Sequence, residues 1–137
     1  GSEMCIRDSV NINRIKNSVD RFGNRFINRI FTGEERLKAD GSGNRIAVYA
    51  KRFAAKEAAW KALGDGYRAG IKWKELAVIN NEHGKPILSF SGRAASILDD
   101  LTPSGMVPRI DLSLSDEPPI AQALVVISAE PQQNSIL

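Results

Sequence analysis

The residues best suited to carry out chemistry lie on one predicted helix. Residues 45–63 are rich in Ala, Lys and Glu and are followed by Gly64, a pattern typical of a helix and its end. Within this stretch Glu57 precedes Lys61 by four positions, so both side chains share one face of the helix. Two interpretations are open: a surface ion pair, or an acid/base or metal-binding pair in a partly buried place, because apolar residues flank it.

A second group of charged side chains consists of arginines in residues 12–30. Apolar residues recur there at every third or fourth position, which predicts a helix, with Gly23 as a point where it could break. At about 100° per residue, four arginines fall within an arc of roughly 80° beside the apolar stripe. These arginines, called the arginine edge below, are Arg14, Arg21, Arg25 and Arg29. The edge is either a docking site for an acidic helix or a nucleic acid backbone, or a solvated surface.

Length and composition are those of an ordinary folded domain. The chain has 137 residues, 42% of them hydrophobic and 26% charged, which predicts one small domain. One cysteine and one histidine exclude an intramolecular disulfide and a Cys/His zinc site, so any metal should be hard and bound by oxygen. No apolar run is long enough to cross a membrane, and the first nine residues lack the apolar stretch of a signal peptide. We expect a cytoplasmic location and no membrane partner.

The charge is unevenly distributed along the chain. The net charge is +3, but residues 14–74 carry 15 basic and 6 acidic side chains, a net charge of +9, whereas residues 75–137 carry a net charge of −5. A segment this basic indicates an anionic partner: a nucleic acid, a phosphorylated small molecule or an acidic protein. The alternative is that these charges form only a solvated surface.

The elements that position these residues can be predicted from hydrophobic periodicity and turn residues. The predicted elements are helices at residues 12–30, 45–63 and 91–101, strands at residues 76–80, 86–90, 109–115 and 121–127, and a loop at residues 39–44. The first two strands form a hairpin, and the last two are antiparallel neighbours across the turn at residues 116–119. Helices followed by antiparallel strands predict an α+β fold, a single domain over residues 1–137 with helices packed on an antiparallel sheet and a flexible tail at residues 131–137.

One segment resembles a known family closely. Residues 52–66, RFAAKEAAWKALGDG, resemble the signature helix of the holo-acyl-carrier-protein synthases, the small, single-lobed bacterial type of 4′-phosphopantetheinyl transferase. Residues 14–35, the Gly84-Lys85-Pro86 turn and LSLS at residues 112–115 extend the resemblance over about residues 8–128. The resemblance implies the 4′-phosphopantetheinyl transferase fold. It also implies an enzyme that transfers 4′-phosphopantetheine from coenzyme A to a serine of apo-acyl carrier protein, releasing adenosine 3′,5′-bisphosphate, in support of fatty acid biosynthesis.

The resemblance also implies roles for individual residues. Asp8 and Glu57 match the ligands of Mg²⁺, a cation that suits phosphoryl transfer because it takes few carboxylates and completes its shell with waters and phosphate oxygens. The implied catalytic residues are Glu57, Lys61 and Asp116, with Lys61 meeting the diphosphate. The implied coenzyme-binding residues are Arg52, Lys61, Gly64, Gly66, Lys85 and Pro86. The arginine edge matches the surface that receives the acidic recognition helix of the carrier protein, so no nucleic acid partner is expected.

The family consists of homotrimers whose active sites lie between subunits, and the same arrangement is expected here. The sequence departs from the family at two places. Residues 1–7, GSEMCIR, replace an apolar, glycine-containing strand, so we interpret them as a non-native or atypical N-terminus. Asp116 stands where many members carry a histidine. Because an aspartate with a pKa of about 3.9 is a weaker base, Glu57 or a metal-held water could take the serine proton instead.

Two other functions remain open at this stage. A non-catalytic basic module could dock an acidic protein or RNA through the arginine edge, which would explain the basic segment but not the matching positions of Asp8, Glu57 and Lys61. A family member that has lost catalysis is the third hypothesis, suggested by the altered N-terminus.

Overall fold

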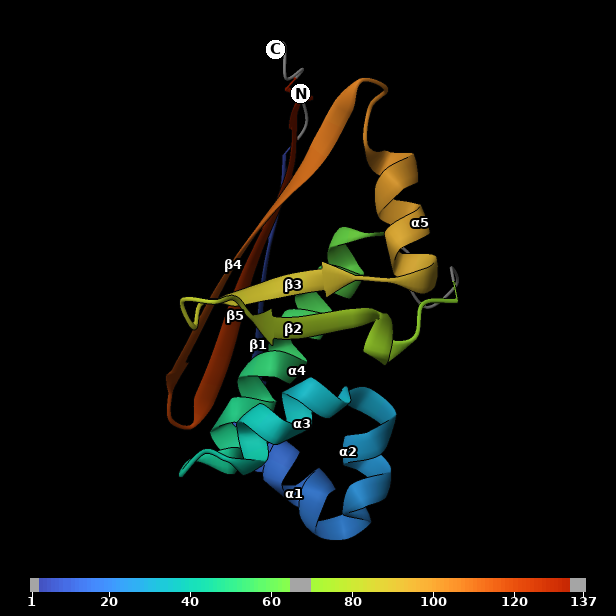
Figure 1. The fold of residues 1–137 in the computed structure, drawn as a ribbon. Helices are drawn as coiled ribbons and strands as arrows, with labels where there is room; N and C mark the ends of the chain where they lie inside the picture. The colour runs from blue at the N-terminus through green and yellow to red at the C-terminus, as the bar shows by residue number, and fades with distance from the viewer. Residues whose placement is uncertain (1–2, 65–69, 134–137) are drawn as a thin grey trace.

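The computed structural model describes residues 3–64 and 70–133. The elements in chain order are β1 (Met4–Asn11), α1 (Ile12–Phe22), α2 (Asn24–Ile30), α3 (Gly33–Asp40), α4 (Arg45–Ala62), the 3₁₀ turn η1 (Trp73–Glu75), β2 (Leu76–Asn80), β3 (Pro86–Phe90), α5 (Gly92–Leu101), β4 (Met106–Glu117) and β5 (Ile120–Pro131). The strands form an antiparallel sheet in the order β1-β5-β4 and a separate β2-β3 hairpin (Figure 1). The predicted α+β class is confirmed.

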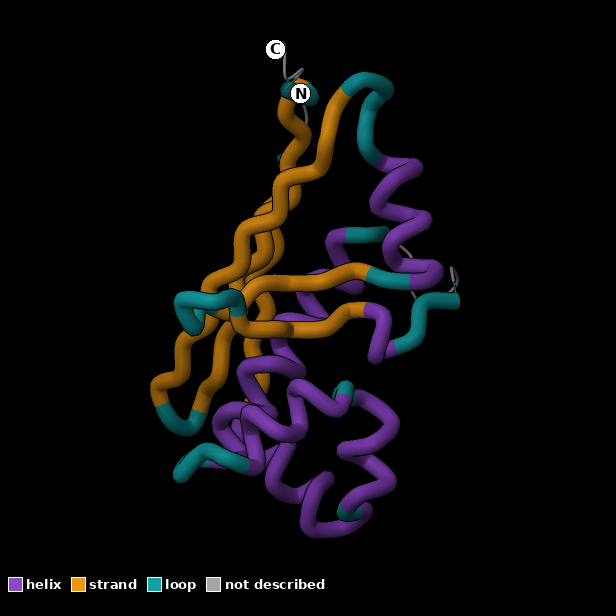
Figure 2. The backbone as a smooth tube through the Cα atoms, in the orientation of Figure 1, coloured by secondary structure: helices purple, strands orange, loops and turns teal. Residues whose placement is uncertain are grey.

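Helix α4 is the centre of the domain. It packs against β1 and β5 on one side and contacts α1, α3 and β2 on others. Alanines fill most of its buried positions, and their small side chains let the helix lie close to the sheet. Figure 2 shows α1, α2 and α3 gathered at one end of the molecule and α5 beside the β2-β3 hairpin. Arg52, Glu57 and Lys61, which are expected to be functional, lie on α4, and Asp8 lies on β1 next to it.

The two faces of the β1-β5-β4 sheet differ in polarity. Leu112, Ala123 and Val125 are buried and lie on the face that meets α4. The opposite face carries exposed polar side chains: Arg7, Ser9, Asp111, Ser113, Ser115 and Gln122. Within residues 3–64 and 70–133, no helix covers this second face, which we call the outer sheet face (Figure 1). Apolar and polar side chains thus alternate along the strand predicted at residues 109–115.

A buried ion pair joins the helical end of the domain to the hairpin. Lys56 Nζ lies 2.7 Å from Glu35 Oε1, and both side chains are fully buried. The Lys56 ammonium also donates to the carbonyl oxygens of Trp73 and Leu76, while the amide of Val78 donates to Glu35 Oε2. One pair of charges thus connects α3, α4, η1 and β2.

The predicted helix over residues 12–30 is interrupted. Gly23 has a φ of 56°, in the left-handed region that favours glycine, and it separates α1 from α2. Helix α3 was not predicted as a separate element, although Thr32 and Glu35 form a capping box that signals its start. In contrast, α4 begins at the predicted residue and ends within one residue of the predicted end, and β2, β3 and α5 agree with the prediction closely.

The long strands extend further than predicted. β4 includes Pro108, which looks like a strand breaker in the sequence but is tolerated because β4 is an edge strand. Pairing with β5 continues to Glu117, so Asp116 lies in the strand and not in a loop. β1 forms within the atypical segment because residues 4–11 pair with β5 along their whole length. β5 includes Pro131, and residues 134–137 of the predicted tail lie outside the described residues. No helix in the described part of the chain is long and apolar enough to span a membrane.

Candidate active site

The structure brings three of the predicted site residues together between β1 and α4. Asp8 faces α4 from β1, and its carboxylate Oδ1 accepts a hydrogen bond from Lys61 Nζ at 2.8 Å. The other oxygen, Asp8 Oδ2, is buried and has no hydrogen-bond partner within the described chain. Glu57 lies one turn before Lys61, close enough to Asp8 for the two charges to interact. The expected shared face of Glu57 and Lys61 is therefore the face turned to Asp8.

The electrostatics of this cluster show two carboxylates held together. Burial raises the pKa of the Glu57 carboxyl, and the negative charge of Asp8 raises it further, whereas Lys61 and Arg14 oppose the shift. The hydrogen bond to Asp8 raises the pKa of the Lys61 ammonium. Lys61 thus pairs with Asp8 and does not form the simple ion pair with Glu57 that was one interpretation of the sequence. We call Asp8, Glu57 and Lys61 the carboxylate–lysine cluster.

Arg52 lies on a different side of α4 and contacts the hairpin. Its Nη2 donates to Asn80 Oδ1 at 3.1 Å, and Asn80 Nδ2 donates to the carbonyl oxygen of Gly84 at 3.0 Å. The side chain is almost fully buried, which lowers the pKa of the guanidinium, and its Nε lacks a partner in the described part. This chain of contacts fixes the turn that carries Lys85 against α4.

Asn81 gives the same turn its shape. Its Oδ1 accepts hydrogen bonds from the amides of His83 and Lys85, both at 2.9 Å, as in an Asx turn. Pro86 follows as the first residue of β3, opposite Asn80. Gly64 ends α4 with a φ of 88°, whereas Gly66, the remaining predicted coenzyme-binding residue, lies outside the described residues.

Asp116 is held near the start of α4 by Lys51. The two charged groups lie 2.9 Å apart, and each side chain is about one quarter exposed. No hydrogen bond or ion pair within residues 3–64 and 70–133 connects Asp116 to the carboxylate–lysine cluster. The predicted catalytic residues of one chain therefore fall into two separate groups.

The break at Gly23 changes how the arginine edge is built, because Arg14 and Arg21 belong to α1 while Arg25 and Arg29 belong to α2. The arc calculated for a continuous helix is therefore wrong. The turn between the helices nevertheless directs three of the arginines to one groove of about 560 Å³. This groove, called the arginine groove, is lined by Arg14, Arg25 and Arg29 together with Phe22, Phe26, Phe53 and Trp73.

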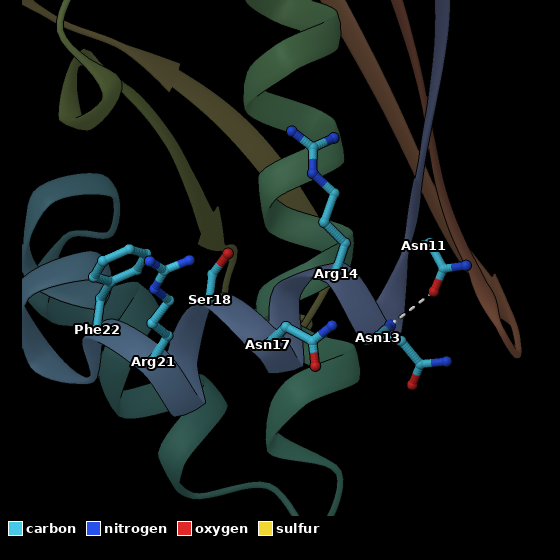
Figure 3. A pocket seen from close by; sticks show the side chains of 7 residues that line it. All are labelled: Asn11, Asn13, Arg14, Asn17, Ser18, Arg21 and Phe22. Atoms are coloured by element: carbon cyan, nitrogen blue, oxygen red, sulfur yellow. Dashed lines mark hydrogen bonds between the residues drawn. The ribbon is translucent and has the colours of Figure 1, made fainter.

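Arg21 lines an adjoining hollow that shares Arg14, Ser18 and Phe22 with the arginine groove. Figure 3 shows Arg14, Ser18 and Arg21 on the same side of α1. The Arg21 guanidinium lies over the Phe22 ring, 5.2 Å from its centroid. All four arginines thus border one continuous surface with an aromatic floor.

Sequence reasoning missed several residues that position this site. Asn80 and Lys51 hold predicted site residues, but a single Asn or Lys in these contexts carries no distinctive signal. The aromatic floor was missed because Phe26, Phe53 and Trp73 are far apart in sequence, yet their rings stack at 6.4 and 5.4 Å between centroids. Glu75 was also missed: its Oε2 accepts a hydrogen bond from the amide of Arg93 and caps α5, whereas the Ser91 side chain makes no capping hydrogen bond.

Comparison with known proteins identifies the fold and the relatives of the chain. The family model of the 4′-phosphopantetheinyl transferase superfamily matches residues 7–114. The holo-(acyl-carrier-protein) synthase of Rhizobium leguminosarum bv. trifolii is 49% identical over 125 residues, 91% of this chain and 93% of that protein. The synthase of Rhodopseudomonas palustris strain BisB5 is 51% identical over 128 residues, covering 90% and 92%.

Solved structures agree with these relatives. The holo-(acyl-carrier-protein) synthase of Neisseria meningitidis superposes with a TM-score of 0.77 at 34% identity, covering 90% of this chain and 96% of that one. The synthase of Helicobacter pylori in complex with coenzyme A has a TM-score of 0.74 at 26% identity, covering 91% and 100%. The family predicted from residues 52–66 is confirmed: the chain belongs to the 4′-phosphopantetheinyl transferase superfamily.

Proposed function

We propose that the chain is a holo-acyl-carrier-protein synthase. It transfers the 4′-phosphopantetheine arm of coenzyme A to a serine of apo-acyl carrier protein and releases adenosine 3′,5′-bisphosphate. The observation that carries this proposal is the carboxylate–lysine cluster, which forms between β1 and α4 in a chain about half identical to synthases over most of its length. The non-catalytic basic module has no comparable support.

The cluster fits a hard divalent cation. Asp8 Oδ2 is buried without a partner, and Glu57 is held close to it despite charge repulsion, an arrangement that a bound cation stabilises. Within the described residues no group of three or more His, Cys, Asp or Glu side chains could hold a metal. Two carboxylates are nevertheless sufficient for Mg²⁺, which keeps several waters and uses phosphate oxygens of the substrate. When bound, Mg²⁺ supplies positive charge that neutralises the diphosphate of coenzyme A.

The other two tasks, charge stabilisation on the departing nucleotide and removal of the serine proton, fall to protein side chains. The Lys61 ammonium lies at the exposed edge of the cluster and binds the diphosphate, so that negative charge on the departing nucleotide is stabilised. Glu57, next to the proposed metal site, is the first candidate to accept the serine proton. Asp116, ion-paired to Lys51, is the second candidate base, and it acts at the site of a neighbouring subunit.

The coenzyme lies against Arg52 and the hairpin turn. Lys85, on the turn shaped by Asn81, supplies positive charge for phosphate groups, and the Arg52 guanidinium holds this turn through Asn80 and adds positive charge beside it. Gly64, just past the end of α4, leaves room for close approach of the coenzyme. Gly66, outside the described residues, is proposed as a further coenzyme-binding residue. Pro86, the first residue of β3, restricts the backbone directly after Lys85 and so keeps the turn rigid.

The arginine groove receives the carrier protein. Arg14, Arg25 and Arg29 pair with acidic side chains of its recognition helix, while the aromatic floor accepts apolar side chains of the same helix. An RNA backbone would use the charges of the groove but would leave the floor without an apolar partner.

Three copies of the chain assemble with active sites between them. The outer sheet face is the surface that is available for this contact, and Asp116 lies apart from the carboxylate–lysine cluster of its own chain. In the proposed trimer, Asp116 of one chain approaches the carboxylate–lysine cluster of a neighbouring chain. We place this trimer in the cytoplasm, where it serves fatty acid biosynthesis.

One assay tests the proposal. The purified protein is incubated with coenzyme A, Mg²⁺ and apo-acyl carrier protein, and the carrier protein is then weighed by intact mass spectrometry. The expected result is a mass increase of one phosphopantetheine arm, abolished by EDTA. Carrier-protein binding without a mass increase would favour a non-catalytic module or a family member without activity. Sedimentation analysis of the same sample tests the trimer.

A further inference from the structure

The Lys61 ammonium occupies the place to which a divalent cation would be attracted. It contacts Asp8 Oδ1 at 2.8 Å, beside a second carboxylate on Glu57. The side chain of Lys61 is 58% exposed, whereas that of Asp8 is 11% exposed. A flexible, largely exposed lysine therefore reaches a fixed and mostly buried carboxylate from the solvent side.

The lysine only partly satisfies the charge of the cluster. It binds one oxygen of Asp8 and leaves the buried Oδ2 without a partner. Glu57 retains a raised pKa through burial and the Asp8 charge, with the nearby Lys61 only opposing this shift. A divalent cation would relieve both carboxylates at once. Because the ammonium and the cation depend on the same negative charge, each weakens the binding of the other.

We propose that Lys61 is a counter-ion that the metal displaces: it neutralises Asp8 when no divalent cation is bound, and metal binding releases its ammonium for an anionic group of the substrate. The inference rests on the proposed metal pair of Asp8 and Glu57. With Lys61 paired to Asp8, the metal-free cluster carries less repulsion than two carboxylates without a counter-ion would.

The test is a titration of Mn²⁺ into the metal-free, full-length protein without coenzyme, followed by electron paramagnetic resonance of the free ion. Lys61→Met removes the competing ammonium and should bind Mn²⁺ about two- to fivefold more tightly than the wild type, since ion pairs of this exposure contribute up to about 1 kcal/mol. Lys61→Arg keeps the ion pair and should bind Mn²⁺ with nearly the wild-type affinity.

Arg14→Gln is the matched control. The Arg14 charge also acts on Glu57, but Arg14 forms no ion pair in the described part of the chain, so its removal should increase Mn²⁺ affinity less than Lys61→Met does. If Mn²⁺ affinity rises equally in the two variants, the effect comes from the loss of any nearby positive charge, and the inference is overturned. An unchanged or weaker affinity in Lys61→Met would overturn it as well. If neither the wild type nor Lys61→Met binds Mn²⁺, the metal pair itself is refuted.

Thermal unfolding provides a second readout. In EDTA, Lys61→Met should unfold cooperatively at a lower temperature than the wild type, because Asp8 has lost its counter-ion. Added Mn²⁺ should then raise its unfolding temperature by more than it raises that of the wild type. An equal rise in both proteins would contradict the displacement.

Discussion

At the scale of single residues, the site combines groups that would repel each other without a cation. Asp8 and Glu57 come from different elements and are placed together by the packing of β1 on α4. The ion pair with Lys61 compensates one of these charges. Loss of the Glu57 carboxylate is therefore expected to weaken metal binding strongly and to change the stability of the fold little.

Replacement of Glu57 by Gln tests this expectation. Glu57→Gln should lower kcat at least a hundredfold, because a proposed metal ligand and candidate base is lost. The unfolding free energy in EDTA should stay equal or rise slightly as repulsion with Asp8 is removed. Intact-mass kinetics and urea unfolding measure the two quantities. Glu82→Gln, at an exposed turn residue, is the control and should leave both unchanged. Normal turnover in Glu57→Gln would refute the assignment.

Tyr49 makes the stability of the protein pH-dependent in the alkaline range. Burial raises the pKa of its hydroxyl to about 12, with the hydrogen bond to Asp40 as a further cause. Below pH 10 the tyrosine is protonated in both folded and unfolded chains, so its contribution is complete. Between about pH 10 and 12 the unfolded chain loses the proton first, and stability is lost as the pH rises.

The corresponding measurement compares the wild type with Tyr49→Phe. From pH 10 to 12 the unfolding free energy of the wild type should fall by about 2 kcal/mol more than that of Tyr49→Phe. Urea unfolding at each pH gives both slopes. Parallel curves would contradict the raised pKa, whatever the absolute stability of the variant.

At the scale of elements, α4 carries different groups on different sides. Glu57 and Lys61 face β1, Arg52 and Lys56 face the hairpin and α3, and Lys51 holds the end of β4. One helix therefore fixes the proposed metal site, the proposed coenzyme site and Asp116 relative to one another.

Breaking the buried pair should destabilise this arrangement. Lys56→Met leaves the Glu35 carboxylate buried without its partner and should cost about 3 to 5 kcal/mol of unfolding free energy. Lys56→Met combined with Glu35→Gln should recover part of this loss, because no uncompensated charge remains. Lys16→Met, which breaks an exposed pair with Asp20, should cost less than about 1 kcal/mol. Urea unfolding measures these free energies. Similar losses of unfolding free energy in Lys56→Met and Lys16→Met would contradict the role of the buried pair.

The break at Gly23 sets the orientation of α2 relative to α1, and with it the shape of the arginine groove. Gly23→Ala should cost about 1 to 2 kcal/mol, since its φ of 56° disfavours a side chain, and should weaken carrier-protein binding by shifting α2 relative to α1. Gly33→Ala is the control, because a Cβ there has open space and no positive φ. Urea unfolding and calorimetric titration with the carrier protein should distinguish the two variants. Identical results would contradict the role of Gly23 in shaping the groove.

The sequence was most informative where local signals dominate. Alanine-rich α4, the hairpin turn around Asn81 and the alternating β4 were predictable because periodicity and turn residues determine them locally. Long-range pairing determines the rest. β1 lacks a strand signal of its own and forms through pairing with β5, and the contact between Asp8 and Lys61 joins residues 53 positions apart.

At the scale of the whole molecule, the basic segment is concentrated on the helical end. The arginine groove lies there, while the outer sheet face belongs to a different part of the surface. The proposed docking of an acidic protein and the proposed contact between copies therefore involve separate surfaces, and a change in one should leave the other intact.

Charge reversal tests this separation. Arg14→Glu combined with Arg21→Glu should weaken carrier-protein affinity more than tenfold and reduce its salt dependence, with coenzyme affinity and sedimentation unchanged, because surface charge acts chiefly on docking. Lys38→Glu, an exposed charge reversal on α3, serves as the control. Calorimetric titrations at two salt concentrations provide the affinities. Equal losses for carrier protein and coenzyme would argue against a dedicated docking surface.

The buried Lys56–Glu35 pair also restrains motion of α4. Lys56 and Glu57 are consecutive, so their side chains point about 100° apart around the helix axis. Any roll of α4 that would move Glu57 away from Asp8 must also pull the Lys56 ammonium from Glu35 and from two carbonyl oxygens. The helix is thus locked against rotation, and its amide hydrogens should exchange with solvent only when the domain unfolds globally.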